Sequence, residues 1–587
     1  MSFYSTERNV QILVHLLKAN NIRRIIASPG TTNVTFVGTV QHDDFFKMYS
    51  CVDERSAAYM ACGMAAESGE PVVIVCTGAT ASRNYVPGLT EAYYRKLPVL
   101  AVTASQPTER VGHLAPQLID RSQLQHDIAV LSVSMPNIKD SEDEWFCEIN
   151  ANRAMAALTR RGGGPVHINL ETHYSADFSA KKIPPCRIVK YFTHGCAFPE
   201  IKSGRVAVII GNHRKFGQDE VLAIENFCIA YDAAVFCDHT SGYNGAHKVL
   251  WTLCGSQKDY ESPNRNIDLL IHIGEISGDY FTQFVLRPLE VWRVNEDGEM
   301  RDWFKKLSAV FEMSEKEFFS YYANKNVSAA KPEPSFAEKL NKENDMIYSH
   351  LPELPFSNYY IANQCASKLP ENSVLHLGIL SSLRSWNYFK IPPSVSAFSN
   401  TGGFGIDGGV SSMLGAALVN PEKLYFGVFG DLAFFYDMNS IGNRHLPSNI
   451  RIMLINNGVG QEFRNKDHLC YIYGIDSLSY IGAAGHYGNK SKTLVKHYAE
   501  DLGFEYLSAH DKKSFAEIHD RFFSAENVDK PVFFEVFTNT EDETEALDMI
   551  KHCYKNKAIA AKNEMKKAIK SFIGQSGVDS IKGILKK

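Results

Sequence analysis

The sequence predicts an α/β protein built from doubly wound parallel sheets. Short apolar runs typical of buried strands, such as residues 71–77 and 450–455, alternate with segments of helical pattern. Polar or glycine-containing turns follow several of these runs, at the strand ends where doubly wound sheets bind ligands. The chain has 587 residues, and at the usual domain size of about 100–200 residues this length is enough for about three or four domains.

Composition favours a globular cytoplasmic protein. Apolar residues make up 44% and charged residues 22%, and the net charge of −5 gives no case for a nucleic-acid partner. Residues 1–21 carry charges and lack the apolar core of a signal peptide; Val10, Leu13, Val14 and Leu17 follow helical spacing instead. No stretch approaches the ~18 apolar residues of a membrane helix. The 12 cysteines include no CxxC pair, which favours reduced thiols.

The N-terminal part is expected to form one parallel sheet. After the first helix, residues 24–27 form a short strand, and Ser28-Pro29-Gly30-Thr31-Thr32-Asn33 follows at its carboxyl end, a position where ligands bind. The remaining predicted elements are strands at 71–77, 97–104 and 165–170 and helices after Glu54 and over 84–94. This part ends near residue 180.

The middle and C-terminal parts repeat the pattern after two expected linkers, residues 181–204 and 315–350. Strands are predicted at 206–211, 235–238, 268–274 and 289–294, and further strands begin with 373–378. Gly211-Asn212-His213 lacks a GxGxxG loop, so no flavin is expected.

A strand-turn-helix-strand unit in the C-terminal part carries the strongest functional signal. A buried strand over 423–428 leads to Gly430-Asp431, a helical segment follows, and the strand over 450–455 delivers Asn456-Asn457 to the same sheet edge. A carboxylate, an amide oxygen and a backbone carbonyl are hard ligands suited to Mg²⁺ or Ca²⁺, and a helix N-terminus attracts phosphate. The unit can therefore bind a metal-bridged diphosphate; the alternative is an ordinary strand-helix-strand with a surface Asp.

The spacing resembles the motif of thiamine-diphosphate (ThDP) enzymes. Gly430-Asp431 is followed by 24 residues and then Asn456-Asn457, although Leu432 stands where the family often has Gly. A second, distant feature supports the resemblance: Asp53-Glu54-Arg55-Ser56-Ala57-Ala58 opens a helix of small residues. Alone, Glu54 would be an ordinary acid at a helix start.

Other motifs narrow the resemblance to the SEPHCHC (2-succinyl-5-enolpyruvyl-6-hydroxy-3-cyclohexene-1-carboxylate) synthases of menaquinone synthesis. They are the Ser-Pro-Gly turn, Glu91-Ala92-Tyr93-Tyr94, Gln117-Leu118-Ile119-Asp120 and the C-terminal GDLxxxYDxN pattern. The resemblance covers most of residues 1–545. It implies a pyrimidine-binding domain (1–180), a middle domain (190–312), a diphosphate-binding domain (352–545) and a basic helical tail (546–587).

The resemblance also implies roles for individual residues. Glu54 would contact N1′ of the aminopyrimidine and favour the imino tautomer that deprotonates thiazolium C2; Gln117 would be a second catalytic residue. Mg²⁺ would be held by Asp431, Asn457 and the Val459 carbonyl. Ile406 would force the bent coenzyme conformation, unless it is plain core packing. The remaining implied contacts to ThDP come from Ser381, Gly405, Gly430, Leu432, Ala433 and Gln461.

The substrate loops depart from the family. Family arginines are replaced by neutral residues within Thr31-Thr32-Asn33, at Gln106 and at Thr401. Because Arg pairs best with carboxylates, the acceptor is expected to be less anionic, a carbonyl for example, with the Thr31-Thr32-Asn33 loop contacting substrate. Arg384 remains, and it is expected to hold a distal carboxylate of the donor, if there is one, as in 2-oxoglutarate; the alternative is a surface Arg paired with an acid.

The expected activity is decarboxylation of a 2-oxo acid with transfer of the resulting enamine to a carbonyl or alkene acceptor, by a homodimer or homotetramer. Simple decarboxylation and a catalytically silent ThDP-fold subunit stay open. Residues 551–587 carry ten lysines and two acidic residues, a net +8. Such a basic helix can lie on a membrane or dock a partner, but a solvated helix packed on its own domain is the commoner case and is favoured here.

Overall fold

The computed structural model describes residues 3–121, 124–202, 204–326, 333–485, 491–526 and 529–555. The chain divides into two compact units: unit 1 contains Met1–Cys196 and Glu299–Val310, and unit 2 contains Ala197–Gly298 and Phe311–Lys587. The basic tail expected after residue 555 lies outside the described residues. All the strand pairs given below are parallel, which confirms the predicted α/β fold class.

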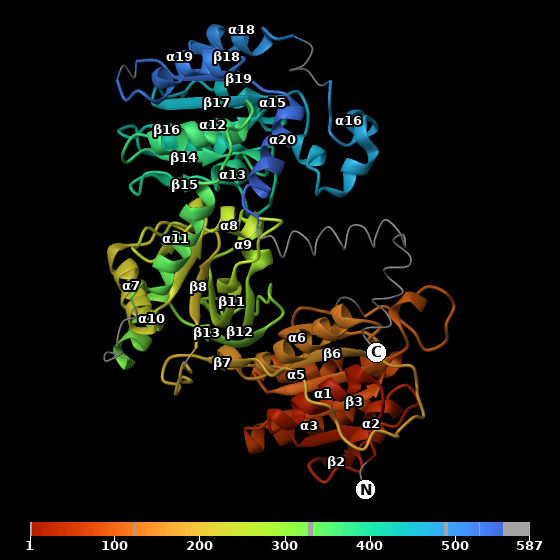
Figure 1. Ribbon diagram of the computed structural model, residues 1–587. Coiled ribbons are helices and arrows are strands. Elements are labelled where there is room, and N and C mark those ends of the chain that lie inside the picture. The colour runs from red at the N-terminus through yellow and green to blue at the C-terminus, as the bar shows by residue number, and fades with distance from the viewer. Residues whose placement is uncertain are drawn as a thin grey trace, which may run out of the picture. The chain divides into compact units, whose positions relative to one another are not determined.

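Unit 1 is built on a six-stranded parallel sheet of order β2-β1-β3-β4-β6-β5 (Figure 1). Its strands are β1 Arg24–Ala27, β2 Lys47–Ser50, β3 Val72–Thr77, β4 Val99–Ser105, β5 Leu131–Met135 and β6 Val166–Glu171. Its helices are α1 Arg8–Ala19, α2 Val34–Val40, α3 Glu54–Ser68, α4 Thr80–Asn84, α5 Val86–Arg95 and α6 Ser141–Ala157. The sequence did not predict β2 and β5, and the helix expected over 84–94 is interrupted at Tyr85 between α4 and α5.

Alternating side chains of β3 show why this sheet is covered on both faces. Val73 and Val75 pack into one apolar cluster with residues of α1 and α6. Val72, Ile74 and Cys76 pack into a second cluster with residues of α3 and α5. Successive side chains of a strand point to opposite faces, so a strand that is apolar throughout must have a helical layer on each side.

The first sheet of unit 2 contains the parallel order β10-β9-β8-β11-β12. These strands are β8 Val206–Ile210, β9 Ala234–Cys237, β10 Lys248–Val249, β11 Asn266–Ile273 and β12 Arg287–Asn295. Nearby helices are α7 Gln218–Tyr231, α8 Thr252–Ser256 and α9 Tyr280–Val285. Two further strands are β7 Lys190–Phe192 and β13 Leu307–Glu312.

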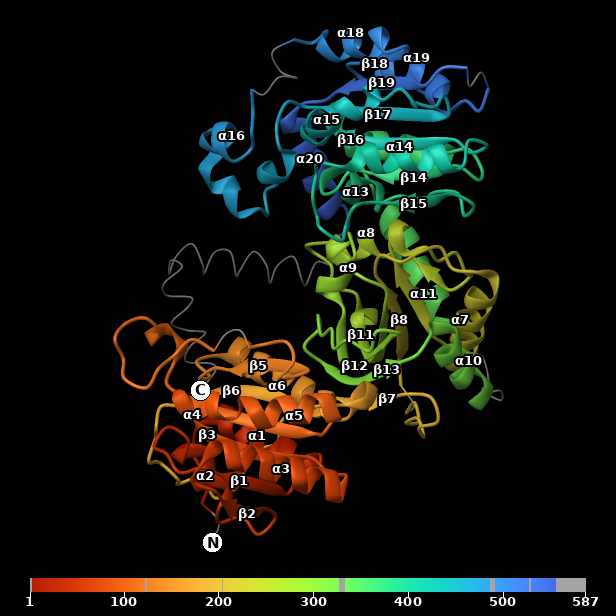
Figure 2. The ribbon, with the colours of Figure 1, turned by 180° about the vertical axis from the view of Figure 1, so that it is seen from behind.

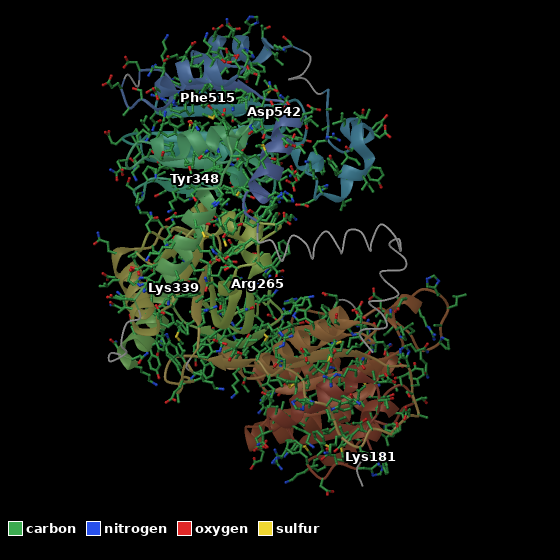
Figure 3. All side chains as sticks on the ribbon, in the orientation of Figure 1. Lys181, Arg265, Lys339, Tyr348, Phe515 and Asp542 are labelled. Atoms are coloured by element: carbon green, nitrogen blue, oxygen red, sulfur yellow. The ribbon has the colours of Figure 1, made fainter. Side chains whose placement is uncertain are left out.

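The prediction of a linker over residues 315–350 is wrong. The structure has two helices there, α10 Glu315–Lys325 and α11 Phe336–Tyr348, the second with Lys339 near its start and Tyr348 at its end (Figure 3). Each helix opens with a capping box, in which a Ser hydroxyl and a Glu three residues later satisfy backbone N–H groups. This Ser-x-x-Glu signal was present in the sequence.

The second sheet of unit 2 has the order β15-β14-β16-β17-β19-β18. Its strands are β14 Val374–Leu377, β15 Ser396–Phe398, β16 Tyr425–Gly430, β17 Ile450–Asn456, β18 Glu505–Ala509 and β19 Val532–Phe537. Its helices are α12 Asn358–Cys365, α13 Ser381–Trp386, α14 Gly409–Val419, α15 Asp431–Asp437, α16 Ser477–Tyr480, α18 Leu494–Asp501, α19 Lys512–Phe523 and α20 Thr540–Lys551. Helices lie on both faces, with α12 visible in Figure 1 and α14 in Figure 2.

Every cysteine is a free thiol. Within the described ranges, no helix combines the length and the apolar character needed to cross a membrane.

Candidate functional site

The ends of β16 and β17 bring the Gly430-Asp431 and Asn456-Asn457 motifs together. The two strands are adjacent and parallel, and Gly430 pairs with Ile455. Asp431 is only 2% exposed; its carboxylate accepts hydrogen bonds from the Leu432 N–H at 2.8 Å and from the Gly458 N–H at 2.5 Å. The loop after β17 is therefore tied to the first residue of α15.

The two asparagines have different roles. Asn456 is buried and donates to the Glu535 carboxylate at 2.7 Å, so it supports the sheet. Burial raises the pKa of Glu535, which also accepts a hydrogen bond from Tyr506. Asn457 instead lines a cavity, and its side-chain oxygen accepts the Val459 N–H at 3.2 Å.

That cavity, of about 150 Å³, gathers most of the residues that the sequence assigned to the coenzyme. The predicted residues that line it are Ser381, Ile406, Gly430, Asp431, Leu432, Ala433, Asn457, Val459 and Gln461. Gly405 precedes Ile406 but is not among the lining residues. The strand edges thus assemble in unit 2 a group of residues that the sequence supplies from several separate segments.

The lining fits a phosphate group and a hard cation. A Cβ built on Gly430 would meet no atom within 4 Å, so the backbone at the start of α15 faces open space. Asp431 and Asn457 supply oxygen atoms at the same edge. In the part of the chain that the structure describes there is no cluster of three or more His, Cys, Asp or Glu that could hold a metal. A cation with one carboxylate, neutral oxygens and phosphate oxygens as ligands matches the preference of Mg²⁺.

Glu543 is a lining residue that sequence reasoning missed. It comes from α20, is 2% exposed, and accepts hydrogen bonds from the Asn358 N–H at 2.9 Å and the Thr538 hydroxyl at 2.8 Å. Burial raises the pKa of Glu543 to about 7 despite those hydrogen bonds, and the nearby charge of Asp431 adds to the rise. No motif spacing marks this residue, because α20 lies far along the chain.

Arg384 does not project a free guanidinium into this cavity. It pairs with the carboxylate of Glu462, itself a lining residue, and lies 4.2 Å from the centre of the Tyr280 ring. Phe404 stacks on Tyr280, with the two ring centres 6.1 Å apart. The structure pairs Arg384 with an acid, but the side chain is only 13% exposed, so it is not the surface Arg of the alternative interpretation, and the carboxylate-binding role stays a prediction.

Glu54 begins α3 in unit 1. The preceding residue, Asp53, caps the helix by accepting hydrogen bonds from the Ser56 N–H and hydroxyl. The half-buried Glu54 carboxylate accepts a hydrogen bond from the Asn84 side chain at 3.0 Å. Its position is thus fixed by a helix start and by one amide, while the cavity around Asp431 belongs to unit 2.

The other predicted residues of unit 1 are mostly engaged with the backbone. Thr32 donates to the Ala104 carbonyl at 2.6 Å, and Asn33 donates to the Ser28 carbonyl at 2.9 Å. Asn33 also lines a cavity of about 420 Å³ between the Ser28-Pro29-Gly30 turn, α2 and β2. Thr31 and Gln117 are exposed, and Gln117 has a positive φ of 58°.

Comparisons with known proteins agree with this geometry. Residues 8–125 match the family described as thiamine pyrophosphate enzyme, N-terminal TPP binding domain, thiamine pyrophosphate being ThDP. The chain is 30% identical over 579 residues to the 2-succinyl-5-enolpyruvyl-6-hydroxy-3-cyclohexene-1-carboxylate synthase of Phocaeicola vulgatus, with 94% of this chain and 100% of the relative covered.

Two further relatives carry the same name. The protein from Bacteroides fragilis is 29% identical over 576 residues, with 94% of this chain and 100% of the relative covered. The protein from Flavobacterium johnsoniae is 27% identical over 554 residues, with 90% and 96% covered. The chain is a ThDP-dependent enzyme that belongs to the family of the 2-succinyl-5-enolpyruvyl-6-hydroxy-3-cyclohexene-1-carboxylate synthases.

Proposed function

We propose that this enzyme uses ThDP and Mg²⁺ to decarboxylate a 2-oxo acid and to transfer the remaining acyl group to a carbonyl or alkene acceptor. The observation that carries the proposal is the cavity of unit 2, where the residues predicted for the diphosphate and the metal share one lining. The likeness to a family of synthases supports transfer to an acceptor over simple loss of CO₂.

When bound, ThDP supplies the nucleophilic carbon that adds to the keto group and the electron sink that accepts the electron pair left as CO₂ departs. Asp431, Asn457 and the Val459 carbonyl would hold Mg²⁺. Gly430 leaves room for the diphosphate, which Ser381, Leu432, Ala433 and Gln461 would surround. The Gln461 side chain is already oriented, because it accepts from the Thr540 hydroxyl at 2.7 Å and donates to the Thr544 hydroxyl at 3.0 Å.

Glu54 would hold the proton at N1′ of the aminopyrimidine. The hydrogen bond from Asn84 fixes one of its carboxylate oxygens and leaves the other for this contact. The family resemblance implies that Glu54 comes from one copy of the chain and the diphosphate site from another, so we propose a homodimer or homotetramer. Sedimentation of the active enzyme should show a dimer or a tetramer. A monomer that retains full activity would contradict the proposal.

We propose that the acceptor carries less negative charge than an acceptor bound by an arginine-rich site. Thr32 and Asn33, in the loop where the family carries an Arg, form hydrogen bonds to backbone carbonyls. Gln106 and Thr401 are neutral as well. Neutral side chains cannot form the bidentate pairs that bind carboxylates strongly, which favours an aldehyde, a ketone or another weakly charged acceptor. The free thiols fit a reducing, cytoplasmic location.

Product analysis by mass spectrometry tests the proposal. The ThDP- and Mg²⁺-loaded enzyme is incubated with a panel of 2-oxo acids, with and without carbonyl acceptors. We expect CO₂ release and a ligated product whose mass is the sum of acceptor and decarboxylated donor. Release of the free aldehyde alone, whatever the acceptor, would identify a simple decarboxylase. Absence of CO₂ release with every donor would contradict the proposal.

A further inference from the structure

A buried arginine lies at the carboxyl edge of the unit 1 sheet, the edge where doubly wound sheets bind ligands. Arg121 is 5% exposed, and its guanidinium donates to the Gly78 carbonyl, just after β3, at 2.8 Å and to the side-chain oxygen of Asn169 on β6. Burial lowers the pKa of Arg121 to about 10, so the side chain is still charged at neutral pH. Both of its acceptors are neutral, whereas a buried arginine is normally paired with an acid.

The charge of Arg121 has no directly bonded counterion. Within the part of the chain that the structure describes, Arg121 forms no ion pair with a carboxylate. Glu171, the last residue of β6, acts on Arg121 through its charge, but one of its oxygens is held by the Thr108 N–H at 3.1 Å and the Thr108 hydroxyl at 2.7 Å. The exposed Arg83 adds a second positive charge nearby. This edge of unit 1 can therefore attract an anion.

Two buried donors beside this charge have no hydrogen-bond partner: the Nε–H group of Arg121 and the hydroxyl of Ser105. Ser105 ends β4 and is 2% exposed. The guanidinium carbon of Arg121 and the Cβ of Ser105 each lie 2.9 Å from where a Cβ on Gly78 would stand, so the two side chains are neighbours. A buried donor without an acceptor costs free energy. A carboxylate would remove this cost, because its two oxygens can accept from a guanidinium and a hydroxyl together.

The same edge of unit 1 carries Glu54. Asn84 of α4 donates to the Glu54 carboxylate at 3.0 Å, and the preceding residue, Arg83, donates to the Asp120 carbonyl at 3.0 Å. These two contacts link the start of α3 to the loop that ends in Arg121. In the proposed function Glu54 contacts the aminopyrimidine, so a substrate that reacts on the coenzyme comes to this edge.

We propose that Arg121 is a specificity-determining residue that binds a carboxylate of a substrate, together with the Ser105 hydroxyl. This inference rests on the proposed function, since it concerns the substrates of that reaction. It supplies a cation to an edge where a family arginine is replaced by Gln106, the residue after Ser105. The carboxylate belongs to the 2-oxo acid donor or to the acceptor, and the probes below separate these two sources.

A binding measurement without turnover tests this role. The protein is loaded with Mg²⁺ and 3-deaza-ThDP, whose ring cannot form the C2 nucleophile, and is titrated by calorimetry with pairs of charged and neutral probes. Pyruvate with pyruvamide, and 2-oxoglutarate with 2-oxopentanoate, represent the two ends of a donor. The pair 4-oxobutanoate and butanal represents an acceptor. The parent should bind the more charged probe of at least one pair at least about tenfold more tightly than its counterpart. Arg121→Met should weaken that binding by roughly 10- to 100-fold, the value of a charge-assisted contact, and leave the counterpart unchanged.

Two conservative variants separate ligand binding from a structural role. Ser105→Ala removes a buried hydroxyl that has no partner, so it should not destabilise the fold. It should still weaken the same acid by roughly 2- to 10-fold, the value of a neutral hydrogen bond. Arg121→Lys keeps the charge but loses the planar fork, and it should restore part of the affinity lost in Arg121→Met. Arg95→Met is the matched control, because the exposed Arg95 at the end of α5 pairs with Glu91 at 3.3 Å; it should change no affinity.

The probe pair that responds identifies the source of the carboxylate. A response of a donor pair agrees with the weakly charged acceptor proposed above. A response of the 4-oxobutanoate pair alone supports the role of Arg121 but counts against that acceptor. The inference is overturned if the parent prefers no acid over its counterpart, or if acid affinities stay unchanged in Arg121→Met, with Ser105→Ala and Arg121→Lys deciding should Arg121→Met not fold. Because binding is measured without turnover, the result stands apart from the product analysis that tests the proposed function.

Discussion

Replacing Glu543 with Gln should change the pH dependence of stability. Glu543 is fully buried in unit 2, and its pKa is raised from 4.5 to about 7, chiefly by burial. Gln is nearly isosteric and retains an oxygen that can accept the hydrogen bonds from Asn358 and Thr538. The substitution therefore removes the ionisation while it preserves the contacts that orient this side chain.

The sign follows from proton linkage. Between pH 4.5 and about 7 the folded protein keeps a proton on Glu543 that the unfolded chain releases. The resulting contribution to stability is fully present below pH 4.5 and is lost as the pH rises through about 7. At ~1.4 kcal/mol for each pKa unit, the contribution of Glu543 changes by about 3.5 kcal/mol over this range. Glu543→Gln lacks this loss, so its stability relative to the parent should rise from pH 5 to pH 8.

Urea unfolding of the coenzyme-free proteins is measured at pH 5, 6, 7 and 8. The unfolding free energy is taken from the transition of unit 2. The difference in unfolding free energy between Glu543→Gln and the parent should increase with pH by about 2–3 kcal/mol. Glu541→Gln, an exposed position on the same helix, should show no such trend. A difference for Glu543→Gln that stays constant with pH would refute the assignment of a buried ionisable carboxyl. Mg²⁺ and ThDP should weaken the trend, because a cation near Asp431 favours ionised Glu543.

Three further substitutions test the coenzyme site. Glu54→Gln should leave the fold intact and reduce exchange of the C2 proton of bound ThDP, followed by NMR, by at least about 100-fold, the range of general acid–base catalysis; near-normal exchange would exclude the role of Glu54. Asp431→Ala should abolish the dependence of ThDP affinity on Mg²⁺ in calorimetry, and an unchanged metal dependence would remove Asp431 from the metal site. Ile406→Ala should lower kcat by roughly 10- to 100-fold through misplacement of the reacting groups, with little change in ThDP affinity; an unaltered kcat would leave Ile406 as simple cavity lining.

The sequence predicted the strands that are buried on both faces. Residues 71–77, 206–211 and 450–455 are mostly apolar runs, the last interrupted by Arg451, and they correspond to β3, β8 and β17. It missed β2, a four-residue strand with no fully buried residue, because an edge strand lacks the apolar signal of a central one. The polar composition of residues 315–350 suggests a linker, whereas the two capping boxes in the same segment predict the helices that the structure has.

The sequence by itself predicted the coenzyme and the residues expected to hold it. Asp431 and Asn457 could be paired because a strand-helix-strand unit has a nearly fixed length and places the ends of both strands at one sheet edge. Glu54 could be assigned a role only through the resemblance of its segment to the ThDP-enzyme motif, because a helix start by itself marks an ordinary acid. Such local units are encoded by consecutive residues.

Only the tertiary structure decided the electrostatics around that chemistry. The pairing of Arg384 with Glu462, and the entry of Glu543 into the cavity, join segments whose separation along the chain follows no rule. Charge interactions depend on distance and burial, and neither quantity can be read from spacing when the residues come from different helices. The sequence therefore establishes which coenzyme this protein uses, whereas the fold decides which charges a substrate meets beside it.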